Sequence, residues 1–246
     1  MEFANCYEDF KRAEAYAKLK FAATYYLAYR DLPEILEKHV KGRKAIDFGC
    51  GTGRSTRFLE KHGFTVLGVD IAQDMIRKAR EIDPKGSYRL IKDGSFHQFK
   101  RNAYDLVLSA LTFDNIPTLE KKVRLFKELK RLLKSEGRIV SIVSAPEIYT
   151  HEWASFSTKD FPGNRFAVSG DVVKIIVTDH EDQRPVEDII WTDDSYQEVF
   201  KQAGLTPTQT YKPLAKGDEP YEWVNETRIA PWVIYVLGKA ATGLGR

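Results

Sequence analysis

The sequence has few cysteines, little net charge and no long apolar run. Its 246 residues include only two cysteines, Cys6 and Cys50, so a disulfide framework is excluded and a reducing compartment is expected. Its 38 basic residues are nearly matched by 35 acidic ones, and a net charge of +3 does not indicate a nucleic-acid surface. No apolar run reaches the length of a membrane span, and residues 1–5 lack a signal-peptide pattern. We therefore expect a soluble, cytoplasmic protein with neither nucleic-acid nor membrane partners.

A glycine-rich turn follows an apolar strand that begins near residue 45. The run from Ala45 to Gly53 reads AIDFGCGTG, and glycine both tolerates positive φ and lets a ligand approach the backbone closely. About twenty residues later a second apolar stretch ends at Asp70, which is placed to accept hydrogen bonds from a ribose diol. The dinucleotide fingerprint GxGxxG is not met, because Arg54 or Thr56 stands where its third glycine is required. The spacing therefore favours S-adenosylmethionine over a nicotinamide dinucleotide.

The motif DFGCGTG at residues 47–53 resembles the signature of the class I methyltransferases, and the resemblance extends over residues 44–143. It implies an α/β fold, a Rossmann-like seven-stranded and mostly parallel sheet with helices on both faces. It also implies S-adenosylmethionine as cofactor and S-adenosylhomocysteine as product. By motif position it implies the following cofactor contacts: Asp47, Gly49 and Gly51 at the methionine end, Asp70 on the ribose, Ile71 and Met75 on the adenine faces, Asp93 and Gly94 at the adenine amino group, and Ser109 and Ala110 beneath the sulfur. Ordinary core packing is the alternative for Ile71 and Met75.

Strand and helix patterns alternate along the middle of the chain, which favours a parallel sheet covered on both faces. Further strands are predicted over residues 65–70, 88–92, 105–109 and 138–143, with a short helix over 74–80. A helix over residues 119–133 has Thr118 as a plausible N-cap and Gly137 just past its end. A last helix over 195–203 stops at Gly204, and two strands follow over 205–211 and 232–237. In the family fold these two strands form a hairpin whose final strand inserts antiparallel.

The same patterns divide the chain into five segments. They are an N-terminal helical cap over the cofactor (1–40), the cofactor-binding core (41–143), a substrate-binding lid inserted before the last helix (144–194), a C-terminal helix and hairpin that complete the sheet (195–239), and a flexible tail (240–246). The lid is about fifty residues that the core fold does not require, and inserts of that size are usually functional. It emerges at the carboxyl ends of the strands, where open α/β sheets bind ligands.

Candidate binding residues flank the core on both sides. In methyltransferases of this type an N-terminal helix closes over the cofactor, so Tyr25, Tyr26 and Arg30 are candidates for its methionine end. Arg30 suits the cofactor carboxylate, although an arginine at a helix end is equally expected as a solvated charge. In the lid, the aromatic candidates for substrate contact are Tyr149, Trp153 and Trp191, unless they only pack the lid onto the sheet.

A proton acceptor is needed if the atom that is methylated carries a proton. His151 is the preferred base because it lies just beyond the fifth strand, with Glu152 and Asp114 as further candidates. The alternatives are a structural histidine, or an acceptor that needs no base. No metal is expected. Asp114 and Asn115 could supply two ligands, but Ser109 and Ala110, directly at the end of the fourth strand, supply no carboxylate to join them.

The predicted function is methyl transfer to a nitrogen or oxygen of a small, aromatic or heteroaromatic molecule. Residues 24–33, 146–153 and 229–235 resemble the small-molecule methyltransferases that include the toxoflavin-pathway N-methyltransferase. Two alternatives stay open, a tRNA or protein methyltransferase and a catalytically inactive protein that binds S-adenosylmethionine. The aromatic lid favours an enzyme with a small-molecule acceptor, acting as a monomer or homodimer.

Overall fold

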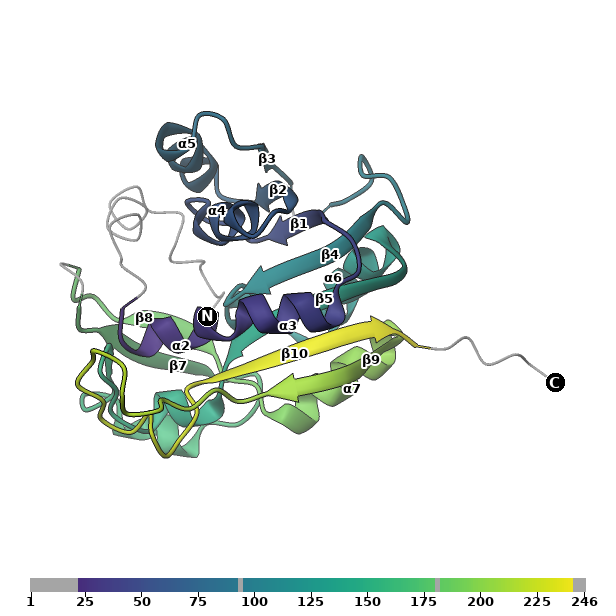
Figure 1. Ribbon diagram of the computed structural model, residues 1–246. Coiled ribbons are helices and arrows are strands. Elements are labelled where there is room, and N and C mark those ends of the chain that lie inside the picture. Colours follow the sequence, from purple (N-terminus) through teal and green to yellow (C-terminus); the bar gives the residue numbers. More distant parts are fainter. Residues whose placement is uncertain (1–21, 93–94, 180–181, 241–246) are drawn as a thin grey trace.

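A seven-stranded sheet forms the centre of the computed structural model, which describes residues 22–92, 95–179 and 182–240 (Figure 1). The strand order is β3-β2-β1-β4-β5-β10-β9. The strands are Lys44–Phe48 (β1), Thr65–Asp70 (β2), Tyr88–Leu90 (β3), Tyr104–Ala110 (β4), Leu133–Ser144 (β5), Leu205–Tyr211 (β9) and Trp232–Lys239 (β10). Strands β1 to β5 run parallel, whereas β10 lies antiparallel between β5 and β9. The predicted Rossmann-like fold, with its antiparallel final strand, is confirmed.

Helices cover both faces of this sheet (Figure 1). They are Thr24–Arg30 (α2), Leu32–His39 (α3), Arg54–Lys61 (α4), Gln73–Ile82 (α5), Leu119–Leu132 (α6) and Asp193–Ala203 (α7). Successive residues of a strand point to opposite faces, so Leu106 and Leu108 of β4 belong to the same core cluster as α3 and α4. Val107 between them belongs to the cluster of α6 and α7. A strand that is buried on both faces needs apolar side chains at successive positions, and β4 has them.

The lid carries a second, smaller sheet of three strands, Phe156–Ser157 (β6), Val172–Val177 (β7) and Val186–Ile189 (β8). Strands β7 and β8 pair antiparallel with Val173 opposite Asp188. The alternation at residues 172, 174, 176 and 178, opposing residues 186–191, predicts a hairpin in this part of the lid, and the pairing confirms it. Short 3-10 helices complete the connections: Phe113–Asn115 (η2) after β4, Pro146–Tyr149 (η3) after β5, and Pro162–Phe166 (η4) within the lid. The lid therefore begins directly at the carboxyl end of β5.

Local capping explains where the helices start and stop. Thr118 caps α6 as predicted, since its Oγ1 accepts a hydrogen bond from Lys121 N at 3.2 Å. Gly204 ends α7 in the left-handed conformation with φ of +68°. The predicted role of Gly137 is wrong, because α6 ends at Leu132 and β5 begins at the next residue. A Cβ at Gly137 would lie 2.9 Å from the carbonyl oxygen of Tyr104, so this glycine lets β5 approach β4.

Parts of the predicted segments lie outside the described residues, namely the first residues of the N-terminal cap, Asp93 and Gly94, and nearly all of the tail. Strand β3 is shorter than predicted, since it ends at Leu90. Within the described ranges, no helix is both long and apolar enough to cross a membrane.

Candidate cofactor and acceptor sites

The glycine loop between β1 and α4 is built from left-handed backbone. Gly49, Gly51 and Gly53 have φ of +71°, +52° and +81°, conformations that side chains disfavour. The loop is fixed to the neighbouring strand, because Gly49 N donates to Val69 O at 2.8 Å. A Cβ on Gly49 would lie 2.2 Å from Thr112 Oγ1, so no larger residue fits between this loop and the end of β4.

Asp70 ends β2 and faces the glycine loop. Its Oδ2 accepts a hydrogen bond from Gly51 N at 2.8 Å, and its Oδ1 accepts one from Ala72 N at 2.9 Å. Burial raises the pKa of this carboxyl, while the backbone N–H groups that it accepts from act in the opposite direction. Each oxygen keeps a further lone pair, which leaves the carboxylate able to accept from two hydroxyls of a ligand.

Asp47 is fully buried beneath the loop. Its Oδ2 accepts hydrogen bonds from the hydroxyls of Ser55 and Thr56, both at 2.7 Å, which fasten the first turn of α4 to β1. Burial raises the pKa of Asp47 to about 6 despite these two donors. Its Oδ1 has no hydrogen-bond partner in the described part of the chain. The predicted contact with the methionine end of the cofactor is thus left to this one oxygen.

The remaining predicted cofactor residues differ in exposure. Ile71 follows Asp70 and is 47% exposed, unusual for a large apolar side chain and suited to covering a flat apolar ring. Met75 is 2% exposed, which favours ordinary core packing over contact with adenine. The Ser109 hydroxyl is buried at the end of β4 without a partner among the described residues, and Ala110 beside it is partly buried. Left-handed glycines, a poised carboxylate and unpartnered buried oxygens together fit S-adenosylmethionine.

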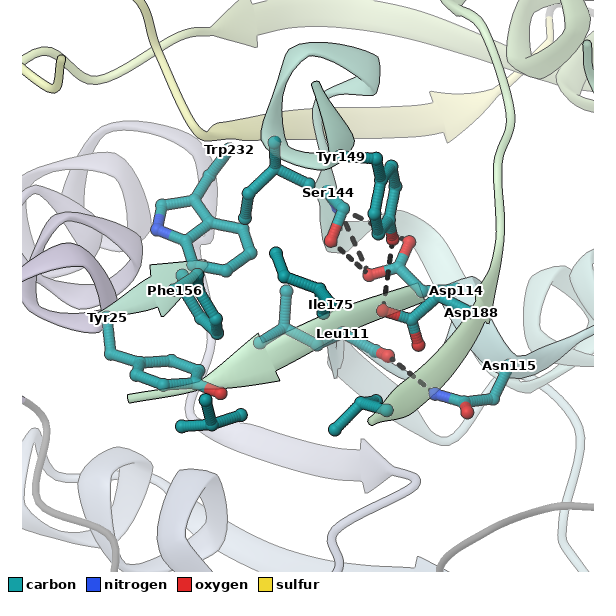
Figure 2. Close-up of a pocket in the computed structure, with 13 residues that line it drawn as sticks. Tyr25, Leu111, Asp114, Asn115, Ser144, Tyr149, Phe156, Ile175, Asp188 and Trp232 are labelled. Atoms are coloured by element: carbon teal, nitrogen blue, oxygen red, sulfur yellow. Dashed lines mark hydrogen bonds between the residues drawn. The ribbon is translucent and has the colours of Figure 1, made fainter. Parts of the chain in front are cut away.

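A pocket lies beside this loop at the carboxyl ends of β4 and β5, and Figure 2 shows its lining. The space bounded by its lining, counted together with the open mouth and the solvent in it, is about 410 Å³. The lid supplies Ile175, Val177, Val186 and Asp188 from one face of its hairpin. The other lining residues are Tyr25, Leu111, Asp114, Asn115, Ser144, Ile148, Tyr149, Phe156 and Trp232. Three predicted site residues, Tyr25, Asp114 and Tyr149, therefore meet in one cavity.

Two carboxyl groups stand side by side at one end of this pocket (Figure 2). Asp114 accepts from Ser144 N at 3.1 Å and from Ser144 Oγ at 3.0 Å. Asp188 accepts from the Tyr149 hydroxyl at 3.1 Å. Desolvation raises the pKa of Asp188 to about 8, and the negative charge of Asp114 acts in the same direction. Two like charges this close in a dry site favour retention of one proton.

Lys122 is a buried cation behind the two carboxyl groups. It lies on the buried face of α6, and its Nζ donates to the carbonyl oxygen of Phe113. Nζ also lies 4.9 Å from the ring centre of Trp191 and 5.2 Å from that of Tyr196. Burial lowers the pKa of Lys122, whereas the charge of Asp114 raises it. The ammonium is thus held among aromatic rings, outside the pocket lining.

The three N-terminal residues that were predicted to bind the methionine end of the cofactor make other contacts in the structure. Arg30 is held by two carboxylates, with Nε 2.7 Å from Asp31 Oδ1 and Nη1 2.7 Å from Glu219 Oε1. Neither predicted role for Arg30 fits, because its guanidinium is neither directed to a cofactor nor solvated. Tyr25 lines the pocket at the ends of β4 and β5, while Tyr26 packs against Tyr221 with ring centres 5.4 Å apart and the rings tilted by 50°.

Four lid residues that were predicted to be catalytic or to bind substrate do not line the pocket at the ends of β4 and β5. His151 Nδ1 lies 3.1 Å from the carbonyl oxygen of Glu147, and Glu152 accepts from the backbone and hydroxyl of Thr158. Trp153 is buried and donates its indole N–H to the carbonyl oxygen of Ile148. Trp191 is buried against Lys122. The predicted catalytic roles of His151 and Glu152 are therefore wrong for this pocket, and both tryptophans pack the lid, the alternative that the sequence left open.

Loss of the His151 imidazole should leave catalysis almost unchanged, because the ring contacts backbone instead of the pocket. We expect His151→Ala to keep kcat within about threefold, where loss of a general base costs about 100-fold or more. His62→Ala is a matched control, since His62 Nδ1 makes the same kind of contact with Phe58 O at 2.8 Å. Profiles of kcat against pH for both variants are the measurement, and loss of the acid limb in His151→Ala alone would restore His151 as the base.

Asp188 should make the stability of the protein depend on pH. Its pKa is raised to about 8 in the folded state against about 3.8 for the free side chain, so its contribution to stability falls as pH rises between these values. Asp188→Asn removes this titration, and its Tm relative to the parent protein should rise by at least about 3 °C between pH 5.5 and 8.5. Asp160→Asn, on the exposed surface of the lid, should show no such trend. Thermal unfolding at both pH values tests this, and parallel curves for all three proteins would contradict it.

Two site residues that the sequence interpretation missed left recognisable signals. Asp188 alternates with Val186 in β8 and with Ile190 directly after it, so a carboxylate occupies an inward position of a half-buried strand. Lys122 falls three and four residues before Leu125 and Phe126 on the buried face of α6. A charged residue at a position predicted to be apolar is the common signal.

Comparison with known proteins finds similarity to methyltransferases. The model of a family described as methyltransferase domain matches residues 46–141. An uncharacterized methyltransferase of Bacillus cytotoxicus is 32% identical over 142 residues, which are 56% of this chain and 62% of that protein. The chain thus spans less than two thirds of this curated relative.

Solved structures share the fold over most of the chain. The PH0226 protein of Pyrococcus horikoshii OT3 gives a TM-score of 0.64 at 21% identity, covering 92% of this chain and 98% of that one. An S-adenosylmethionine-dependent methyltransferase of Clostridium acetobutylicum gives 0.62 at 14% identity, covering 96% and 100%. The family model covers residues 46–141, whereas the fold is shared over more than nine tenths of the chain.

Proposed function

We propose that this chain, whose residues 46–141 are a methyltransferase domain within a class I methyltransferase fold, transfers a methyl group from S-adenosylmethionine to a small molecule. The acceptor atom is a nitrogen or oxygen of an aromatic or heteroaromatic compound. The observation that carries the proposal is the adjacency of two sites at the end of β4. Thr112 touches the glycine loop through its hydrogen bond to Phe48 O at 3.0 Å, and Leu111 before it lines the acceptor pocket.

The residues of the glycine loop and of β2 hold the cofactor. Asp70 accepts hydrogen bonds from the ribose, Gly49 and Gly51 allow the close approach of the methionine end, and Ile71 covers the adenine ring. When bound, S-adenosylmethionine supplies a methyl group that its sulfonium already makes electrophilic. The protein has then to align the acceptor, exclude water and take up a proton where the acceptor carries one.

Leu111 supports this positioning role. It has φ of +62°, an uncommon conformation for a large side chain, and it is held there because Leu111 N donates to Ile142 O at 2.9 Å. Strained backbone that the surrounding structure fixes is found preferentially at functional sites. The turn directs the chain from the end of β4 into η2, which carries Asp114.

The chemistry of the acceptor pocket favours a small molecule over a tRNA or protein. Its lining combines aromatic rings with buried polar groups, the pattern of a small-ligand site. A protein that only senses S-adenosylmethionine has no need of a second lined cavity beside the cofactor. The resemblance of residues 146–153 to methyltransferases of the toxoflavin type agrees with a heteroaromatic acceptor.

Transfer of a labelled methyl group tests the proposal. The protein is incubated with S-adenosylmethionine carrying a labelled methyl group and a panel of amine, phenolic and heteroaromatic acceptors, and labelled products are separated from the cofactor. We expect transfer to at least one small acceptor, both with and without EDTA, since no metal is expected to take part. Transfer only to bulk tRNA or protein would favour the alternative class, and tight cofactor binding without any transfer would favour a sensor.

A further inference from the structure

At the end of the acceptor pocket that holds the two carboxyl groups, hydrogen-bond acceptors are spare, while the donors of Ser144 and Tyr149 are engaged. Ser144 donates its N–H and its hydroxyl to Asp114, and the Tyr149 hydroxyl donates to Asp188. Among the described residues, Asp188 accepts from Tyr149 alone, although a carboxylate offers about four acceptor positions. The Oδ1 atom of Asn115 is buried without a donor in the same part of the chain. A ligand that satisfies this lining must bring hydrogen-bond donors of its own.

The charge at this end of the pocket is also unbalanced. Lys122 is the buried cation nearby, yet its Nζ donates to a backbone carbonyl and lies against aromatic rings. It forms no ion pair within 4.0 Å with Asp114 or Asp188, all three being described residues. One carboxyl therefore keeps a proton when the pocket is empty of cations. A cationic ligand can replace that proton.

Aromatic rings form the opposite wall of the pocket (Figure 2). The ring centres of Tyr25 and Phe156 lie 4.9 Å apart, and that of Trp232 lies 5.8 Å from Tyr25 and 5.9 Å from Phe156. Such a wall suits an apolar or flat skeleton and also favours a nearby positive charge. The ligand that fits this pocket therefore has hydrogen-bond donors and a positive charge at one end and an apolar skeleton at the other. A small amine has both properties.

We propose that the methyl acceptor is a small amine that is protonated in water, with its nitrogen bound by Asp114 and Asp188 and its carbon skeleton against Tyr25, Phe156 and Trp232. This inference rests on the proposed methyl transfer and narrows it to nitrogen. The charge-assisted hydrogen bonds between ammonium and carboxylates would supply orientation as well as affinity.

The same pair of carboxyl groups accounts for the proton. The bound ammonium gives one proton to a carboxylate oxygen of Asp188, which frees the nitrogen lone pair. That lone pair forms a bond to the methyl carbon while the carbon–sulfur bond breaks and its electron pair stays on sulfur. The products are the N-methylated ammonium, S-adenosylhomocysteine and a protonated Asp188. Because burial raises the pKa of Asp188, this carboxylate accepts a proton more readily than an exposed one.

Calorimetry with matched ligand pairs tests this assignment without turnover. The protein is saturated with S-adenosylhomocysteine and titrated with benzylamine, 2-phenylethylamine and propylamine, each beside the alcohol of the same skeleton. At least one amine should bind about 10-fold or more tightly than its alcohol. At pH 7 its binding should release up to one proton, seen as a heat that changes with the ionisation enthalpy of the buffer. The alcohols should release none.

Variants identify the group responsible. Asp188→Asn should remove most of the preference for the amine and the proton release, and Asp114→Asn is a second variant for the same pair. Asp160→Asn is the matched control on the exposed lid surface and should retain both properties.

Failure of S-adenosylhomocysteine to bind would overturn the proposed function itself. If it binds but no amine exceeds its alcohol, methyl transfer stands and the amine assignment falls. Undiminished preference and proton release in both Asp188→Asn and Asp114→Asn would likewise overturn the assignment.

Discussion

Replacing Gly49 with alanine is expected to weaken the binding of S-adenosylhomocysteine by at least about 30-fold. The backbone at Gly49 has φ of +71°, which costs an L-residue roughly 1–2 kcal/mol. The added methyl group would also lie 2.2 Å from Thr112 Oγ1, and such overpacking costs typically about 1–3 kcal/mol. The loop can relieve both only by moving away from the end of β4, which disturbs the surface on which the cofactor lies.

Gly63→Ala separates these two causes. Gly63 has φ of +79°, close to that of Gly49, but an added Cβ there meets nothing within 4 Å. We expect this variant to lose about 1 kcal/mol of stability and to keep its affinity for S-adenosylhomocysteine. Calorimetric titration and thermal unfolding of both variants make the comparison. Equal affinities in Gly49→Ala and the parent protein would show that the loop does not form the cofactor site.

Replacing Asp70 with alanine should weaken cofactor binding by roughly 1.5–3 kcal/mol, or about 10- to 150-fold. Two ribose hydroxyls would lose a charged acceptor. In addition, Gly51 N and Ala72 N would lose the hydrogen bonds of 2.8 and 2.9 Å that hold the loop to β2. Asp70→Asn keeps one acceptor oxygen and should lie between alanine and the parent protein.

Asp105→Ala is the matched control for Asp70. Its carboxylate also accepts from a backbone N–H, that of Lys44 at 3.0 Å, and from Lys134 Nζ at 2.7 Å. It stands at the amino end of β4, whereas the glycine loop lies at the carboxyl ends of the strands. Stability should fall in both variants and affinity in Asp70→Ala alone. If both lose affinity alike, a general loss of stability and not loss of a ribose contact explains the effect.

The sequence by itself determined the sheet, its cofactor loop and the hairpin of the lid. These features rest on local rules, because apolar runs specify buried strands and positive φ requires glycine at Gly49, Gly51 and Gly53. Capping is equally local, so α6 begins after Thr118 and α7 ends at Gly204, as the sequence predicts. The prediction that Gly137 follows the end of a helix was wrong for a nonlocal reason. The glycine is needed where β4 approaches closely, and the neighbouring residues in the sequence do not reveal this contact.

Only the tertiary structure decided which polar residues meet in the acceptor pocket. Asp114, Ser144 and Asp188 are brought together by contact of η2, the end of β5 and the lid hairpin. Arg30 forms an ion pair with Glu219, which is 189 positions away in the sequence. The partner of a charged side chain is set by the packing of distant elements, and burial then sets its pKa. For that reason the sequence predicts His151 as the base. In the fold, His151 contacts the carbonyl oxygen of Glu147, and Asp188 is buried beside Asp114.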